Sequence, residues 1–111
     1  YNADMSNIIS ETLSINGVVL DQVSYRTSVN GKPIELGPTE FRLLRHFMNN
    51  TERVFTRSQL LDRVWGTNIY IEERTVDVHI RRLRKALEPY QKSDLIQTVR
   101  GAGYRFSAQN P

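Results

Sequence analysis

The segment from about Arg74 to Leu87 constrains the fold of this chain more than any other part of the sequence. At 100° per residue, four aliphatic side chains fall within about 40° of one another. They are spaced i, i+4, i+7 and i+11, and they are Val76, Ile80, Leu83 and Leu87. This spacing predicts a helix that buries a narrow apolar stripe. Pro89 ends it, because proline cannot continue the hydrogen-bond ladder.

The opposite side of the same helix is almost purely cationic. Basic residues, with one small apolar residue among them, repeat the same spacing there: Arg74, Val78, Arg81 and Lys85. Thr75 and Arg82 flank this face on one edge, and Arg84 flanks it on the other. Asp77 stands four residues before Arg81, so we expect the two to pair and Asp77 to orient the arginine. A surface helix that is basic by chance is the alternative interpretation.

Composition limits what the 111-residue chain can be. Hydrophobic residues make up 39% and charged residues 24%, which excludes a wholly disordered chain or a fibre and fits one globular domain. Cysteine is absent, so disulfides, thiolate metal sites and cysteine nucleophiles are excluded, and we expect a cytoplasmic protein. No apolar run approaches the ~18 residues of a membrane span. The first methionine, Met5, is preceded by four other residues, so we expect the chain to be a piece of a longer protein.

Charge is distributed unevenly along the sequence. Residues 1–56 carry 5 basic and 6 acidic side chains, whereas residues 57–111 carry 10 basic and 6 acidic ones. We therefore expect the C-terminal half to meet an anion, with nucleic acid the first candidate and an acidic membrane the second. A solvated basic face without a partner is the alternative.

The N-terminal third has the signals of a small antiparallel sheet. Short alternating segments between Thr12 and Leu36 are separated by Asn16-Gly17 and Asn30-Gly31, which are typical of type I′ hairpin turns. We expect about four strands here. Residues 1–10 have no periodicity and are expected to be a linker or an added tail.

Two further helices precede the basic one, and a hairpin follows it. The first begins at Pro38 after a Gly37 cap and ends near Asn49-Asn50. The second begins with the capping box Thr56-Arg57-Ser58-Gln59 and ends near Trp65-Gly66. Val54-Phe55 reads as a very short strand, and the chain closes with strands at Leu95 to Val99 and Tyr104 to Ser107.

This order predicts an α+β fold of the winged helix-turn-helix class over residues 11–108. It would comprise an N-terminal four-stranded antiparallel sheet, three helices and a C-terminal β-hairpin wing. The short second helix and the long third helix form the scaffold and recognition pair.

The cationic face of the third helix suits the major groove of double-stranded DNA. Arginine forks bridge phosphates or read guanine, and a small side chain such as Val78 meets the thymine methyl. Arg100 projects from the glycine-flanked hairpin tip and could reach a minor groove. His79 borders this face, either as a donor to DNA or as a packed boundary residue. Trp65 is expected to be half buried, with its indole N–H free for a phosphate or a carbonyl.

Other classes of function have less support. With His46 as the only other histidine and no clustered acids, we expect no metal, no cofactor and no enzyme activity. A membrane-surface helix would need a broad apolar face, and an RNA binder would need aromatic stacking platforms. The alternative that stays open is a winged-helix module that binds protein and not DNA, whose third helix would carry apolar or acidic residues outward.

Several segments together resemble one known family, the OmpR/PhoB group of bacterial two-component response regulators. They are Leu36–Leu44 (LGPTEFRLL), Val54–Leu61 (VFTRSQLL), Arg74–Lys85 (RTVDVHIRRLRK) and Thr98–Phe106 (TVRGAGYRF). The resemblance covers about residues 8–107. Val64–Asn68 and Ala86–Pro89 further resemble the phosphate-regulon branch. Gly37 departs from the family, in which many members carry Ser or Thr.

The resemblance implies sequence-specific binding to promoter DNA as head-to-tail dimers on direct repeats. It assigns DNA contacts to Arg74, Thr75, Val78, His79, Arg81, Arg82 and Arg84 of the helix, to Thr98, Arg100, Gly101 and Tyr104 of the wing, and to Arg57 and Trp65. It implies that the loop from Trp65 to Glu73 contacts the σ subunit of RNA polymerase through Trp65, Gly66, Ile71 and Glu73. A receiver domain with the phosphate-accepting aspartate would lie upstream of Tyr1.

Overall fold

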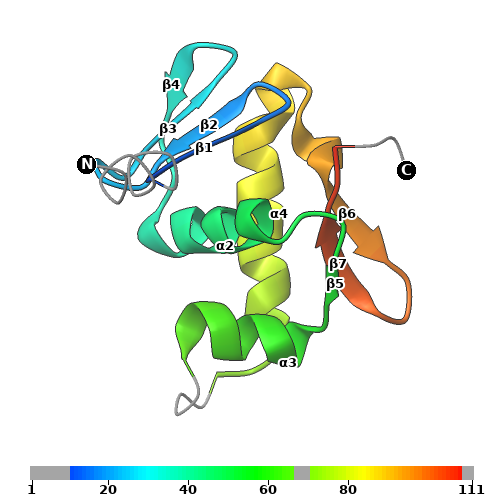
Figure 1. Ribbon diagram of the computed structural model, residues 1–111. Coiled ribbons are helices and arrows are strands. Elements are labelled where there is room, and N and C mark those ends of the chain that lie inside the picture. Colours follow the sequence, from blue (N-terminus) through cyan, green and yellow to red (C-terminus); the bar gives the residue numbers. More distant parts are fainter. Residues whose placement is uncertain (1–10, 67–70, 109–111) are drawn as a thin grey trace, which may run out of the picture.

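The computed structural model describes residues 11–66 and 71–108 of the chain. Its N-terminal part is an antiparallel sheet in the order β1-β2-β3-β4, shown in blue and cyan in Figure 1. The strands are β1 (Thr12–Ile15), β2 (Val18–Asp21), β3 (Arg26–Val29) and β4 (Lys32–Ile34). The four strands predicted from the sequence are confirmed, and the linker predicted at residues 1–10 lies outside the described residues.

Both predicted hairpin turns have the backbone that a type I′ turn requires. Asn16 and Gly17 have φ values of 52° and 87°, and Asn30 and Gly31 repeat this with 53° and 82°. Positive φ at both central positions matches the right-handed twist of the flanking strands. The register that follows pairs Leu13 with Leu20 and Val18 with Val29, so Val18, Leu20 and Val29 all point into the core.

Three helical segments form the centre of the domain. They are α2 (Pro38–Asn49), α3 (Arg57–Leu60) continued by the π-helical turn η1 (Leu61–Trp65), and α4 (Arg74–Leu87). The predicted bounds of these helices are confirmed. Thr56 caps α3 in the predicted capping box, because its hydroxyl accepts from the Gln59 amide at 3.1 Å and the Gln59 side chain accepts from the Thr56 amide at 2.9 Å.

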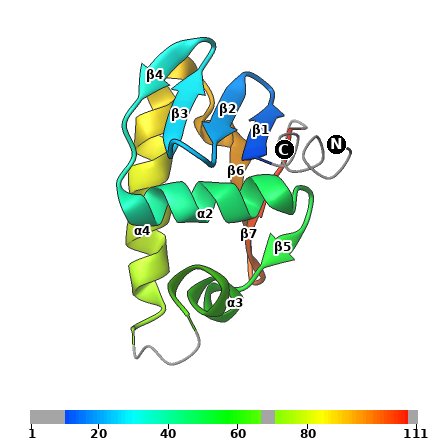
Figure 2. The ribbon, with the colours of Figure 1, turned by 60° about the vertical axis from the view of Figure 1, so that its left-hand side comes forward.

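The long helix α4 organises the packing, because α2 crosses it and the two sheets lie beside it (Figure 2). The predicted stripe on α4 is completely buried: Val76, Ile80, Leu83 and Leu87 are each at most 1% exposed. From α2 the core receives Phe41, Leu43, Leu44, Phe47 and Met48.

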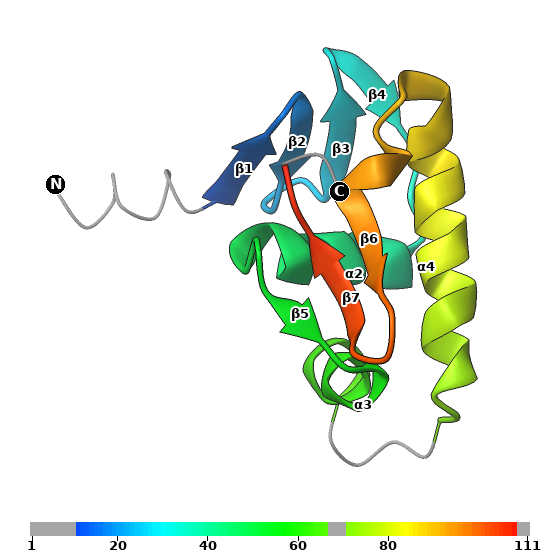
Figure 3. The ribbon, with the colours of Figure 1, turned by 90° about the vertical axis from the view of Figure 1, so that its right-hand side faces the viewer.

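Two short 3₁₀ turns, η2 (Glu88–Tyr90) and η3 (Ser93–Leu95), lead from α4 to the C-terminal hairpin, β6 (Ile96–Val99) and β7 (Gly103–Phe106). The hairpin is not free-standing, as Figure 3 shows. The strand β5 (Val54–Phe55) pairs with β7, which gives a three-stranded sheet in the order β5-β7-β6. The sequence predicted β5 without predicting its partner.

The joint between β5 and β7 depends on Gly103. Its φ is +143°, and a Cβ atom placed there would lie 2.0 Å from the carbonyl oxygen of Phe55. Only glycine lets the two backbones approach this closely. The wing is therefore attached to the strand that leads directly into α3. In the described part of the chain, no helix combines the length and the apolar character needed to cross a membrane.

Candidate nucleic-acid interface

The outward face of α4 is exposed as the sequence predicted. Arg74, Arg81, Arg82 and Lys85 are all exposed. Val78 lies among them with 45% of its surface accessible, although it is a large apolar residue. Arg74 makes an exposed ion pair with Glu72, with 2.6 Å between Nε and Oε2, and such a pair is easily exchanged for another anion. This face offers guanidinium groups around one methyl-bearing side chain.

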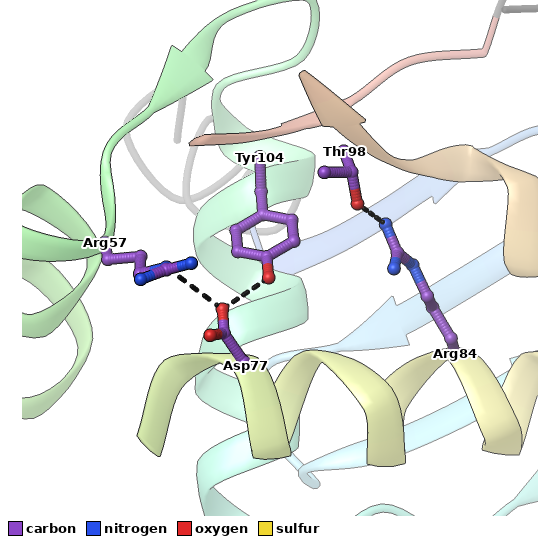
Figure 4. A network of polar contacts seen from close by, with 5 residues as sticks. All are labelled: Arg57, Asp77, Arg84, Thr98 and Tyr104. Atoms are coloured by element: carbon purple, nitrogen blue, oxygen red, sulfur yellow. Dashed lines mark hydrogen bonds and ion pairs between the residues drawn. The ribbon is translucent and has the colours of Figure 1, made fainter. Parts of the chain in front are cut away.

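Asp77 connects α4 to two other elements through one carboxylate oxygen (Figure 4). Its Oδ1 accepts a hydrogen bond from the Tyr104 hydroxyl of β7, and it lies 3.2 Å from Nε of Arg57 in α3. The expectation that Asp77 pairs with Arg81 is therefore wrong. The two residues share helical spacing, but the Asp77 side chain turns to the edge of α4 that faces the wing, where Tyr104 and Arg57 lie.

Arg84 fixes the wing to α4 from the same edge of the helix. Its Nε donates to the carbonyl oxygen of Ile96 at 2.9 Å, and its Nη2 donates to Oγ1 of Thr98 at 2.7 Å. The guanidinium carbon also lies 5.6 Å from the ring centroid of Tyr104. Figure 4 shows this arginine extending from α4 to Thr98 of the hairpin. The structure thus gives Arg84 and Thr98 a role in placing the wing, and their contact with DNA stays a prediction.

Tyr104 is an interior residue of the wing. Its exposed fraction is 8%, and its hydroxyl is bonded to Asp77. Burial raises the pKa of the Tyr104 phenol above its ordinary value of 10.0, and the hydrogen bond and negative charge of Asp77 raise it further. A direct contact between Tyr104 and DNA was predicted from the resemblance. The hydrogen bond to Asp77 shows that Tyr104 also holds the wing beside α4, and its contact with DNA stays a prediction.

The tip of the wing extends beyond the hydrogen bond between Tyr104 and Asp77. Arg100, Gly101 and Ala102 are exposed, and Gly101 has a φ of +75° with open space around it. An open hollow separates the tip from the start of α3, and it is lined by Thr56, Arg57, Ser58, Glu73 and residues 98–104. Two predicted contact residues, Arg57 and Arg100, therefore line one concave surface.

His79 has the packed boundary position that the sequence left as one of two interpretations. Its Nδ1 contacts the carboxylate of Glu40 in α2, and 17% of its side chain is exposed. The Trp65 ring packs against it, with 5.4 Å between the ring centroids. Trp65 is half buried, as predicted. Donation from His79 to DNA stays a prediction, and the sequence spacing gave no signal of the Glu40 contact.

Only part of the predicted polymerase-contacting loop is described. Residues 67–70, which include Ile69 and Tyr70, lie outside the described residues. Gly66 ends η1 with a φ of +111°, Ile71 is half buried, and Glu73 is exposed at the start of α4.

Among residues 11–66 and 71–108, no three His, Cys, Asp or Glu side chains lie close enough together to hold a metal ion.

Residues 31–106 match the family described as transcriptional regulatory protein, C terminal. The chain belongs to this family and is a PhoB-like effector domain of the OmpR/PhoB response regulators, as the sequence predicted. It is 61% identical over 99 residues to the phosphate regulon transcriptional regulatory protein PhoB of Pseudomonas aeruginosa, which covers 88% of this chain and 42% of that protein. It is 56% identical over 101 residues to PhoB of Escherichia coli, and this match covers 91% of this chain and 44% of that protein. The chain thus spans less than half the length of these relatives.

Solved structures of related domains confirm the winged-helix fold. The DNA-binding domain of the response regulator AdeR, solved in complex with an intercistronic region, has a TM-score of 0.78 and 30% identity, and the match covers 88% of this chain and 99% of that one. The Klebsiella pneumoniae RstA DNA-binding domain, solved with the RstA box, has a TM-score of 0.77 and 28% identity, covering 89% and 99%. Both relatives were solved with DNA.

Proposed function

We propose that this domain binds double-stranded promoter DNA sequence-specifically, with α4 in the major groove and the tip of the wing in the minor groove. The observation that carries the proposal is the outward face of α4, where exposed arginines surround the exposed Val78. Arginine reads guanine in bidentate fashion, and an apolar side chain meets the thymine methyl. In this arrangement the remaining arginines bind phosphates and set the register on the duplex.

The position of the wing supports the same proposal. Asp77 and Arg84 hold the hairpin beside α4 at two points, which places its tip on the same side of the domain as the start of α3 and α4. Arg100 at that tip is suited to a narrow minor groove, where negative potential is concentrated. Arg57 and Trp65 would contact phosphates beside the major groove.

The experiment is an anisotropy titration of the domain against labelled direct-repeat promoter DNA and against a scrambled duplex of the same composition. We expect the direct repeat to bind at least ~10³-fold more tightly than the scrambled DNA at physiological salt. Equal affinity for both duplexes and for heparin would show a general polyanion binder. No binding to either would favour the alternative, a winged-helix module that binds protein.

We further propose that the protein acts in the cytoplasm as a transcription activator of the phosphate-regulon type. In this proposal it binds as head-to-tail dimers, follows a receiver domain in its full-length form, and contacts the polymerase σ subunit through the loop from Trp65 to Glu73. The half-buried Ile71 and the exposed Glu73 next to the basic face support the loop assignment. Glu73→Lys should leave DNA affinity within about twofold and lower activation in reconstituted transcription. Equal loss of both would assign the loop to DNA or to folding.

A further inference from the structure

A buried carboxylate in α2 has no part in the function proposed so far. Glu40 stands in the first turn of α2 and is only 7% exposed. Carboxylates are seldom buried unless they are paired, because desolvation of the charge is costly. The partner is His79 of α4, whose Nδ1 meets Oε2 of Glu40. This contact joins α2 to α4, the two helices that cross in Figure 2.

His79 is in turn the neighbour of residues on the proposed DNA-binding surface. It lies one helical turn from Thr75 and from Arg82, on the edge of α4 between the core stripe and the cationic face. Its ring is tilted by 59° against that of Trp65. Glu40, His79 and Trp65 therefore form a continuous contact from α2 through α4 to η1, which we call the Glu40 relay.

Gly37 makes room for this arrangement. A Cβ atom at residue 37 would lie 2.3 Å from Oε1 of Glu40. A side chain at residue 37 would therefore displace the carboxylate, which is the flexible end of Glu40, from its present position. The absence of a side-chain cap on α2 follows from the same choice. The carboxylate instead lies near the helix N-terminus, where a negative charge is favourable.

We propose that Glu40 is a positioning residue for DNA binding, which acts through His79 and for which glycine at residue 37 leaves room. A partner on one imidazole nitrogen fixes the ring orientation and the tautomer presented by the other nitrogen. Glu40 thereby sets how His79 stands beside Thr75 and Arg82, and how Trp65 packs at the start of the loop. This inference rests on the proposed DNA binding.

The test is a double-mutant cycle in DNA affinity. Glu40→Gln keeps the size of the side chain and removes its charge, and His79→Gln removes the imidazole. We expect Glu40→Gln to weaken binding to direct-repeat DNA by roughly 3- to 30-fold in the parent. We expect no further loss when it is added to His79→Gln, because a residue that acts through His79 has nothing to position in its absence. Glu35→Gln, at an exposed carboxylate before α2, is the matched control and should bind as the parent does.

A second measurement reports on the relay without DNA. Trp65 is the only tryptophan of the chain, so its fluorescence emission monitors the packing against His79. Emission should change in Glu40→Gln and in Gly37→Ser, and stay the same in Glu35→Gln. Gly37→Ser should also weaken DNA binding without lowering the melting temperature, because serine caps α2 while it displaces the carboxylate.

The possible outcomes separate this inference from the proposed function. Equal losses from Glu40→Gln in both backgrounds would overturn the positioning role and leave Glu40 as a support of the fold. Unchanged emission and unchanged affinity in Glu40→Gln would also overturn it, with DNA binding by the parent intact. If the parent does not distinguish direct repeats from scrambled DNA, the proposed function fails and the inference fails with it.

Discussion

Nη2 of Arg84 in the third helix donates to Oγ1 of Thr98 in the wing at a distance of 2.7 Å. The same guanidinium donates to the backbone of Ile96 through Nε. A residue that the family resemblance assigns to DNA contact thus connects two parts of the proposed binding surface. We therefore expect DNA affinity to depend on the relative position of helix and wing as well as on the groups that touch DNA.

Removing this connection should destabilise the fold. Arg84→Ala leaves an acceptor on Ile96 without its donor and should lower the free energy of unfolding by about 1–3 kcal/mol. Arg82→Ala, at an exposed position of the same helix, should change it by no more than about 0.5 kcal/mol. Urea denaturation of both variants measures the difference. Equal stability of the two would mean that the Arg84 contacts do not hold the wing.

The two glycines of the wing should respond very differently to substitution. Gly103→Ala places a Cβ 2.0 Å from the Phe55 carbonyl oxygen, so we expect a loss of at least ~2 kcal/mol. Gly101→Ala meets nothing within 4 Å and suffers only from its φ of +75°, which costs about 1 kcal/mol. Thermal melts compare the pair. A milder effect at Gly103 than at Gly101 would argue against the close approach of β5 and β7.

Alkaline pH should lower the folding stability of the domain through ionisation of Tyr104. Its folded-state pKa is raised above 10.0, so the stability that it contributes is complete below about pH 10 and is lost as pH rises through the folded pKa. Tyr104→Phe should have a lower free energy of unfolding than the parent at pH 8, because Asp77 loses a hydrogen-bond donor. Between pH 8 and pH 11, however, its free energy of unfolding should fall less than that of the parent. Tyr25→Phe, at an exposed ring, should follow the parent curve. Parallel curves for parent and Tyr104→Phe would refute the assignment.

Much of this architecture was predictable because its signals are local. The stripe on α4, the capping box at Thr56 and the turn at Asn16-Gly17 each lie within a few residues, and all three were confirmed. The pairing of β5 with β7 joins segments about fifty residues apart, and no local pattern encodes it.

The candidate site shows the same division between local and distant contacts. Helical spacing identified the exposed cationic face correctly, and it suggested Arg81 as the partner of Asp77. The actual partners, Tyr104 and Arg57, belong to other elements and are brought close only by the packed core. Glu40 and His79 are likewise 39 residues apart in sequence.

The wing arginine should read groove shape. Because a narrow A·T-rich minor groove concentrates negative potential, Arg100→Ala should weaken binding more on half-sites with A·T-rich flanks than on those with G·C-rich flanks. Affinities of the variant on the two flanks, each divided by that of the parent, measure this. The same factor on both flanks would make Arg100 a phosphate contact, and no loss on either would exclude the hairpin as a DNA-binding wing.

The salt dependence of specific DNA binding tests the central claim most directly. If five to eight cationic side chains meet phosphates, log K should fall with log salt at a slope of roughly −4 to −7 on the direct-repeat site. Arg81→Ala should reduce the magnitude of that slope by about 1 if it binds a phosphate, or cost about 1–3 kcal/mol at one base pair if it reads a base. A slope near zero for the parent, with Arg81→Ala indistinguishable from it, would contradict DNA recognition by α4.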